Sequence, residues 1–186
     1  LKGPTSIGLV KLMEDNEAGT SENKYEFTVA GAADEVTPKL IKGELDMAAI
    51  PSNLASVLYN NTEGKIKVLA INTLGVVYIV DKGVGITSVA DLKGKTIYAT
   101  GKGSTPEYAL RYILKENGID PDKDVTIEWK SEPTEVVAVL SSGNGVAMLP
   151  QPYVTVAKSK VEGLNVALDL NAEWEKLDTK SMLITG

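Results

Sequence analysis

The sequence contains no cysteine and no histidine in 186 residues, and its only arginine is Arg111. The absence of cysteine excludes disulfides, thiolate nucleophiles and cysteine zinc sites. The absence of histidine excludes Ser–His and Cys–His catalysis and imidazole metal sites. We therefore expect no catalytic residue of these kinds, no metal site and no cofactor.

Positive charge and long apolar runs are also scarce. The formal net charge is −6 and the isoelectric point is about 4.8, which disfavours nucleic-acid binding. No apolar run reaches the roughly 18 residues of a membrane span. The chain is 43% apolar and 24% charged, an ordinary globular composition. At about 150 residues per domain, this length predicts one domain or two small lobes.

Apolar runs rich in β-branched residues alternate with longer helical patterns. We predict strands at Tyr25–Ala30, Asp46–Ile50, Ile66–Asn72, Val76–Val80, Lys95–Thr100, Val125–Trp129, Val146–Leu149, Asn165–Leu168 and Met182–Thr185. We predict helices at Thr5–Asn16, Asp34–Lys42, Ser52–Tyr59, Ser104–Asn117, Pro133–Ser142, Pro152–Lys160 and Ala172–Leu177. Several strands are continuously apolar, which is typical of strands covered by helices on both faces. The alternation predicts an α/β fold with mainly parallel sheets.

One pattern recurs after about one hundred residues. A helical stretch after Glu35, a glycine and an apolar run end at Pro51, and a similar series runs from Glu135 to Pro150. Any βα unit shares this order of elements, so the repeated pattern alone leaves two interpretations open. One is that both segments are ordinary βα units with no further relation. The other is that they belong to two similar lobes, each presenting a strand-to-helix turn to a common ligand cleft.

The segment Thr100–Glu107 follows a predicted strand and opens a predicted helix. It fails the P-loop pattern because Gly103 follows Lys102, and it fails the dinucleotide pattern because Pro106 replaces the third glycine. A glycine turn at a helix start remains, which presents backbone N–H groups to an anion or dipole. Ser104 and Glu107 have the spacing of a capping box, so capping alone and capping plus ligand contact are both open.

Three further turns have small polar residues at helix starts. Gly3-Pro4-Thr5-Ser6 predicts Thr5 or Ser6 as an N-cap. Pro51-Ser52-Asn53 and Pro150-Gln151-Pro152 each follow a predicted strand. Open α/β sheets bind ligands beyond the carboxyl ends of their strands, so the four turns together indicate a binding site.

Two other groups have mainly structural interpretations. Asp120, Asp122 and Asp124 lack the length, glycine and terminal glutamate of an EF-hand, so we interpret them as a helix-to-strand loop. Tyr108 and Tyr112 lie four residues apart, a spacing typical of core packing; Tyr108 is the better candidate for a ligand contact.

Taken in order, the segments LKGPTSIGLVKLMED, KGELDMAAIPSNLA, VADLKGKTIYATGKGSTPEYAL and SSGNGVAMLPQPYV resemble the solute-binding proteins of ABC importers. The chain is most similar to the branch for nitrate, sulfonate, taurine and thiamine pyrimidines. The resemblance implies the type II periplasmic-binding fold, with a small solute held between two α/β lobes. It also implies an extracytoplasmic location, a lipid anchor in some members, a membrane permease as partner and no bond chemistry.

Carried onto this chain, the resemblance places lobe one at residues 1–82 plus 180–186 and lobe two at 83–179. Crossovers are expected near 81–92 and 170–181, about which the lobes would close on the solute. Members of the family extend further at both ends, so we expect a truncated chain. The ligand-binding residues implied are Gly3, Pro4, Thr5, Pro51, Ser52, Asn53, Asn72, Thr73, Gly101, Gly103, Ser104, Thr105, Pro150, Gln151 and Pro152.

Hydroxyls of Thr5, Ser52, Ser104 and Thr105 are expected to donate to solute oxygens. Arg111 lies two turns into its helix, too far in to clamp an anion, so we expect a neutral, zwitterionic or monoanionic solute. A sulfonate, a nitrate-like anion and a pyrimidine stay open. Two alternative functions are a ligand-sensing domain and an enzyme of the pyrimidine-synthase type; the latter conflicts with the missing histidine and cysteine.

Overall fold

The computed structural model describes residues 1–177, 181 and 183–186. The chain forms two compact units. Unit 1 contains residues 1–74 and 184–186, and unit 2 contains residues 75–183. Each unit is described by itself below.

Unit 2 is built on a five-stranded sheet with the order β3-β2-β4-β1-β5. The strands are β1 (Val77–Lys82), β2 (Thr96–Ala99), β3 (Thr126–Trp129), β4 (Gly145–Pro150) and β5 (Leu164–Asp169). β2 is parallel to both β3 and β4, whereas β1 is antiparallel to β4 and β5. Four strands therefore share one direction, which confirms the predicted α/β class and adds one antiparallel strand inside the sheet.

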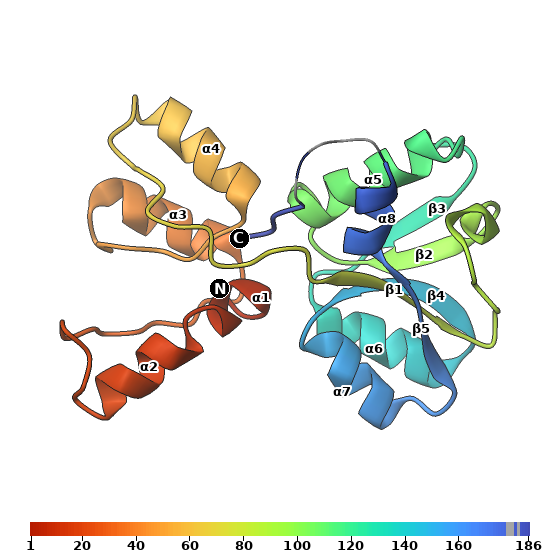
Figure 1. The fold of residues 1–186 in the computed structure, drawn as a ribbon, viewed down its shortest axis with the longest axis horizontal. Coiled ribbons are helices and arrows are strands. Elements are labelled where there is room, and N and C mark those ends of the chain that lie inside the picture. Colours follow the sequence, from red (N-terminus) through yellow and green to blue (C-terminus); the bar gives the residue numbers. More distant parts are fainter. Residues whose placement is uncertain (178–180, 182) are drawn as a thin grey trace. The chain divides into compact units, whose positions relative to one another are not determined.

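Helices cover both faces of this sheet. Figure 1 shows α5 (Thr105–Glu116) and α8 (Leu170–Lys176) on one side, and α6 (Pro133–Ser142) and α7 (Tyr153–Lys160) on the other. Side chains of β4 alternate between the two layers: Val146 and Met148 pack with α5, and Ala147 and Leu149 pack with α6 and α7. A short 3-10 helix, η1 (Val89–Leu92), completes the first layer. The continuously apolar runs were correctly interpreted as strands covered on both faces.

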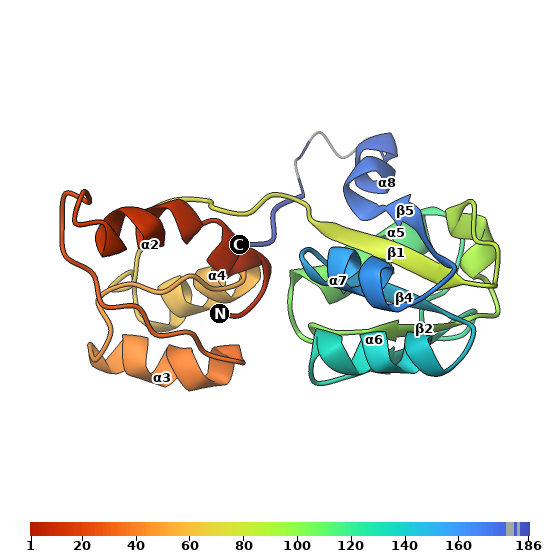
Figure 2. The same cartoon turned by 90° about the horizontal axis from the view of Figure 1, so that it is seen from below.

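Unit 1 consists of helices and extended loops. Its helices are α1 (Pro4–Ile7), α2 (Val10–Glu17), α3 (Ala33–Lys42) and α4 (Ser52–Asn61). The predicted helix Thr5–Asn16 is interrupted at Gly8, a residue with poor helix propensity that packs closely against Asn72. Figure 2 shows how the segments between these helices run as loops.

The three strands predicted in unit 1 do not form. Residues 25–30, 46–50 and 66–72 form no β-ladder in the part of the chain that the structure describes. They make isolated backbone hydrogen bonds instead, such as that from the Lys2 N–H to the Ala30 carbonyl at 2.9 Å. A strand needs a partner for its backbone groups, and an apolar pattern cannot supply one. The single β-bridge of unit 1 joins Leu74 to Ile184, so the predicted final strand is reduced to this bridge; Met182 lies outside the described residues.

The boundary between the units differs from the predicted lobe boundary. Residues 75–82 belong to unit 2, because β1 forms backbone ladders with β4 on one side and β5 on the other. The chain passes between these units at Leu74–Gly75 and Leu183–Ile184, and the crossovers expected near 81–92 and 170–181 stay a prediction. That the two units act as closing lobes stays a prediction.

Candidate functional site

In unit 2, the predicted ligand residues converge on one edge of the sheet. Gly101–Thr105 follow β2, and Pro150–Pro152 end β4 and lead into α7. The two strands are parallel neighbours, with Tyr98 opposite Ala147, so both turns lie at the same end of the sheet. β1 begins at this end, where Val77 pairs with Pro150. We call this end the strand-end edge; it is the position where open α/β sheets bind ligands.

The turn after β2 is held by its own hydrogen bonds. Gly101 and Gly103 have φ angles of 83° and 75°, a region that favours glycine. The Ser104 N–H and hydroxyl both donate to the Gly101 carbonyl, at 3.0 and 2.6 Å. Ser104 is the N-cap of α5, but its hydroxyl makes no cap bond because it is used within the turn. Glu107 accepts the N–H of Gly103 and not that of Ser104, so neither half of the predicted capping box forms.

Carboxylates of the chain itself occupy several helix starts at the strand-end edge. Glu107 accepts the Gly103 N–H at 2.6 Å, and Glu135 accepts the Ser131 N–H at 2.9 Å before α6. Such carboxylates satisfy N–H donors and offset the positive end of the helix dipole. The turn after β2 is consequently a weaker site for an external anion than its glycines indicate.

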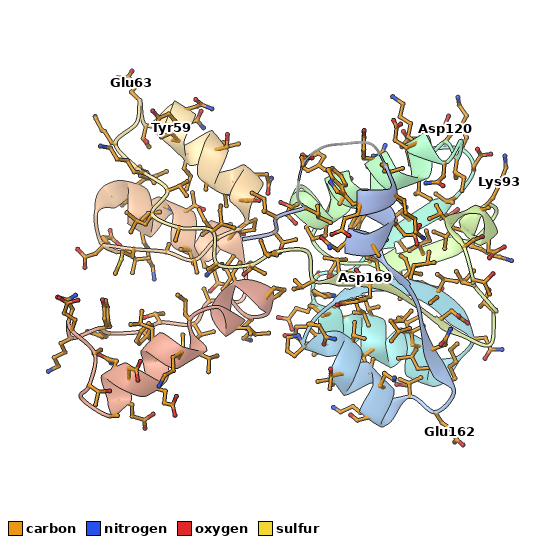
Figure 3. The ribbon with its side chains drawn as sticks, in the orientation of Figure 1. Tyr59, Glu63, Lys93, Asp120, Glu162 and Asp169 are labelled. Atoms are coloured by element: carbon orange, nitrogen blue, oxygen red, sulfur yellow. The ribbon has the colours of Figure 1, made fainter. Side chains whose placement is uncertain are left out.

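A third carboxylate at this edge is Asp169, the N-cap of α8, which accepts the Asn171 N–H at 2.9 Å. Figure 3 labels it at the end of the sheet where β1 begins, consistent with its pairing opposite Tyr78. Burial and, to a smaller extent, the charge of Asp169 raise the pKa of Tyr78 above its ordinary value. Tyr78 therefore stays a neutral phenol throughout the physiological range.

Gln151 is oriented by two contacts. Its N–H donates to the Val76 carbonyl at 3.0 Å, which ties the turn after β4 to the start of β1. The Thr155 hydroxyl donates to Gln151 Oε1 at 3.0 Å. The side-chain amide is thus positioned by the first turn of α7, a precondition for a specific polar contact.

In unit 1, the predicted residues gather around Asn72. The Asn72 Nδ2 group donates to the Thr5 carbonyl at 3.0 Å, and the Thr73 hydroxyl donates to Asn72 Oδ1 at 2.8 Å and the Pro4 carbonyl at 3.3 Å. The N-cap of α1 is Gly3, with φ 99°, not Thr5 or Ser6 as predicted. The hydroxyls of Thr5 and Ser6 donate to the carbonyl of Leu1, which precedes the helix, and so do not cap its N–H groups.

Residues 184–186 connect this group to the start of α4. The Ser52 N–H donates to the Thr185 carbonyl at 3.3 Å, and its hydroxyl donates to the Ile184 carbonyl at 3.3 Å. The N–H groups of Asn72 and Thr73 donate to the Gly186 carbonyl at 3.1 and 2.9 Å. Pro51 is the N-cap of α4, and Asn53 follows Ser52 in its first turn. The sequence did not single out Thr185 and Gly186, because only backbone pairing brings them here.

The hydroxyls have a shared property that changes their expected role. Thr5, Ser52, Thr73 and Ser104 each donate to a backbone oxygen of their own unit. A hydroxyl that donates inward can still accept through its lone pairs. The structure thus favours acceptance over the donation that we expected from Thr5, Ser52 and Ser104. Whether a solute contacts them stays a prediction.

The remaining candidates lie elsewhere in unit 2. Arg111 donates to both oxygens of Asp122, at 2.6 and 2.7 Å, so its charge is committed to the loop after α5. That loop contains Asp120 and Asp124 and is the helix-to-strand connection predicted. Tyr108 is 57% exposed, so its core-packing interpretation is wrong; the core face of α5 is formed by residues 109, 110, 113 and 114.

Two features are absent from the residues that the structure describes. These residues contain no group of three or more Asp or Glu side chains placed to hold a metal ion. They also contain no helix that is both long and apolar enough to cross a membrane.

Comparison with known proteins gives consistent relatives. A binding protein of Brucella abortus is 32% identical over 133 residues, which is 71% of this chain and 40% of that protein. The crystal structure of an ABC transporter from Parabacteroides distasonis is 27% identical in sequence. The match covers 91% of this chain and 56% of the Parabacteroides chain, with a TM-score of 0.69. The periplasmic aliphatic sulphonate-binding protein of Escherichia coli shares the fold, with 20% identity and a TM-score of 0.65. The match covers 100% of this chain and 62% of the Escherichia coli chain.

The chain therefore spans about two fifths of the curated relatives' length and just over half of that of the first structure. Residues 12–161 match the family model for the periplasmic substrate-binding protein of phosphonate ABC transporters. This match supports the predicted solute-binding class but not the specific nitrate, sulfonate and thiamine-pyrimidine branch. The chain belongs to the phosphonate-type family of periplasmic ABC-transporter substrate-binding proteins.

Proposed function

We propose that this chain captures a small solute outside the cytoplasm for an ABC importer and delivers it to a membrane permease. The observation that carries the proposal is the convergence of the turns after β2 and β4 at the strand-end edge. The family match supports the same role. The site binds and releases its solute unchanged, with no catalytic residue, metal or cofactor.

In the proposed mechanism, the solute contacts residues of both units and stabilises a closed arrangement. Unit 2 contributes Gly101–Thr105 and Gln151, and unit 1 contributes the starts of α1 and α4. A solute shifts an open–closed equilibrium only by its difference in affinity for the two states. Contacts to both units supply that difference. A lipid anchor outside the present sequence would keep the protein near its permease.

The chemistry of the strand-end edge restricts the solute. Glu107, Glu135 and Asp169 place three carboxylates there, each already accepting a backbone N–H. The only guanidinium is bound to Asp122. A dianion would meet carboxylates without an arginine clamp, which is unfavourable. We therefore favour a neutral, zwitterionic or monoanionic solute, such as a sulfonate, nitrate or a pyrimidine, over a doubly charged phosphonate.

A melting-temperature panel tests the proposal. Ethanesulfonate, taurine, nitrate, ethylphosphonate and a hydroxymethylpyrimidine are titrated, and hits are measured by calorimetry. A ligand that binds only the folded state raises the melting temperature with its concentration. We expect a concentration-dependent rise with a solute carrying at most one net negative charge. A flat response to the whole panel would contradict the proposed class of solute.

A double variant then tests the site. Ser104→Ala with Thr105→Ala should weaken binding of the hit, by about tenfold for two hydrogen bonds of ordinary net strength. The control is Ser141→Ala with Ser142→Ala in α6, whose hydroxyls also donate to backbone carbonyls, at 2.8 Å each. The two variants should melt at similar temperatures. Equal affinities would remove the turn after β2 from the site.

A further inference from the structure

A cavity of about 610 Å³ opens on the surface of unit 2, beside the second half of α5 and the loop that follows it. Its volume lies within the range of sites for small molecules. All of its lining residues fall between Arg111 and Asp122. The strand-end edge contributes none of them, because α5 begins at that edge and the cavity lies towards its other end. Figure 3 labels a residue of each place, Asp120 at the cavity and Asp169 at the strand-end edge.

The aromatic part of the cavity wall is Tyr112, whose side chain is exposed. Its ring packs on Trp174 of α8, with the ring centroids 5.1 Å apart and an angle of 46° between the ring planes. Trp174 is held in turn by its indole N–H, which donates to the Ser181 carbonyl at 3.1 Å. The tyrosine ring is therefore fixed by its neighbour and still accessible, and it offers an apolar surface and a hydroxyl to a ligand.

Polar groups of both signs line the same cavity. Arg111 contacts both oxygens of Asp122 through Nη2 alone, and none of the described residues accepts from its other guanidinium N–H groups. Asp120 accepts the Asp122 N–H and pairs with Lys123, each at 3.0 Å, and these contacts lower the pKa of its carboxyl. Lys115 is exposed and pairs with no residue in the part of the chain that the structure describes. The lining therefore contains two cations and two anions, whose charges cancel.

These features restrict the class of ligand. An ion with two charges of one sign would meet two like charges of the lining, which is unfavourable. A hydroxyl group both donates and accepts, so a ligand rich in hydroxyls can bond to ammonium and carboxylate groups that lie side by side. The exposed ring of Tyr112 requires an apolar surface against it. A sugar ring has both properties, with hydroxyls around its edge and C–H groups on its face.

We propose that this cavity binds a short saccharide, with one sugar ring stacked on Tyr112 and its hydroxyls bonded to Lys115 and Asp120. The saccharide is either a free sugar or a segment of a polysaccharide, which present the same chemistry to the cavity. The site is a second one, separate from solute capture, because it shares no residue with the strand-end edge.

Amide chemical shifts test the site directly. Maltose, cellobiose, chitobiose and lactose are each titrated into isotope-labelled protein, and a second arm measures retention of the protein by insoluble cellulose, chitin and peptidoglycan. We expect at least one disaccharide to shift amides within residues 111–122, with a dissociation constant of about 1 mM or tighter, and amides 101–105 to stay unchanged. Retention by a polymer without any response to the disaccharides would identify a polysaccharide segment as the ligand. The proposal is overturned if neither arm responds, or if only amides 101–105 shift.

A first set of variants tests stacking on the tyrosine ring. Tyr112→Ala should weaken binding of the responding saccharide by about fivefold, whereas Tyr112→Phe keeps the ring and should bind within about twofold of the parent. The control is Tyr59→Ala in α4, which removes another exposed tyrosine and should leave binding unchanged. Equal losses for the alanine and phenylalanine variants at position 112 would contradict stacking.

A second pair of variants tests the polar lining and decides the matter if Tyr112→Ala fails to fold. Lys115→Ala should weaken saccharide binding by about threefold, because it removes a hydrogen-bond donor. Lys158→Ala is the matched control, since both lysines lie in the last turn of a helix of unit 2. Equal affinities for these two variants would remove Lys115 from the site and overturn the proposed contacts. Because no transported solute is present in these titrations, their failure leaves the capture proposal standing.

Discussion

The two units use similar sequence patterns with different results. In unit 2, apolar runs form strands, and Leu149 in β4 is fully buried between the sheet and α6 and α7. In unit 1, the equally apolar segment 66–72 forms a loop, and its Leu69 is 78% exposed. The difference lies in pairing: β4 has neighbouring strands on both sides, whereas segment 66–72 forms no β-ladder with any of the described residues. Apolar character becomes burial only where backbone partners allow layers to form.

The large exposed apolar side chains follow the same division. Among the residues that the structure describes, twelve of fourteen such side chains belong to unit 1 and two to unit 2. They are Ile7, Val10, Phe27, Val29, Ile41, Met47, Val57, Tyr59, Val68, Leu69, Ile71 and Leu74 in unit 1, and Tyr108 and Tyr112 in unit 2. Unit 2 therefore carries most of the chain's hydrophobic stabilisation, since burial is its source. Substitutions in the two units should differ accordingly.

The largest contrast should come from one substitution made in each unit. Leu149→Ala should lower the free energy of unfolding by about 2–5 kcal/mol, because it removes buried contacts and leaves a cavity. Leu69→Ala should change it by less than about 0.5 kcal/mol, as is usual for exposed positions. Urea unfolding followed by circular dichroism measures both. Similar losses would show that Leu69 is buried in solution and that the comparison of the units is wrong.

An intermediate effect is expected where unit 1 does pack closely. A methyl group at Gly8 would lie 2.6 Å from the Asn72 carbonyl oxygen, a backbone atom that cannot easily move. Gly8→Ala should therefore cost about 1–3 kcal/mol, in the range of overpacking. Gly143→Ala in unit 2 is the matched control, with nothing within 4 Å and an extended φ of −167°. Equal unfolding midpoints for the two variants would contradict the close packing around Asn72.

The smallest expected effect is on the pH dependence of the melting temperature, and it arises from a carboxylate of unit 2. N–H and hydroxyl groups of Thr87 and Ser88 lower the pKa of Asp91 from 3.8 to about 2. A lowered folded-state pKa stabilises the fold fully above pH 3.8, and this contribution disappears as the pH falls towards 2. Asp91→Asn should reduce the dependence of the melting temperature on pH in that window. A pH profile identical to that of the parent would show that these contacts do not hold the carboxylate in solution.

Much of unit 2 could be predicted from sequence because local apolar patterns and turn residues mark its helices and strands. The helix Pro133–Ser142 was predicted with its observed bounds, and the five strands lie within a few residues of their predicted positions. Its candidate residues could also be placed together, since parallel strands end at one edge. Unit 1 could not be predicted equally well, because its apolar segments would form strands only with pairing partners that no local pattern encodes.

Several details of the candidate site could not be predicted from the sequence for related reasons. Ser104 has the spacing of a capping residue, but whether its hydroxyl caps or donates to Gly101 depends on the turn's backbone angles. Thr185 joined the unit 1 cluster only through pairing with residues more than one hundred positions away. The raised pKa of Tyr78 likewise depends first on its burial and then on the charge of Asp169 in another strand.

Hydrogen–deuterium exchange with and without the best solute of the panel tests the central claim most directly. Capture by both units predicts that the solute slows exchange together at amides 101–105, 151 and 153 of unit 2 and at amides 5–6 and 52–53 of unit 1. Arg111 and its neighbours, whose charge is committed to Asp122, should be unchanged. Slower exchange in one unit alone, with the other unaffected at saturation, would contradict capture between two units.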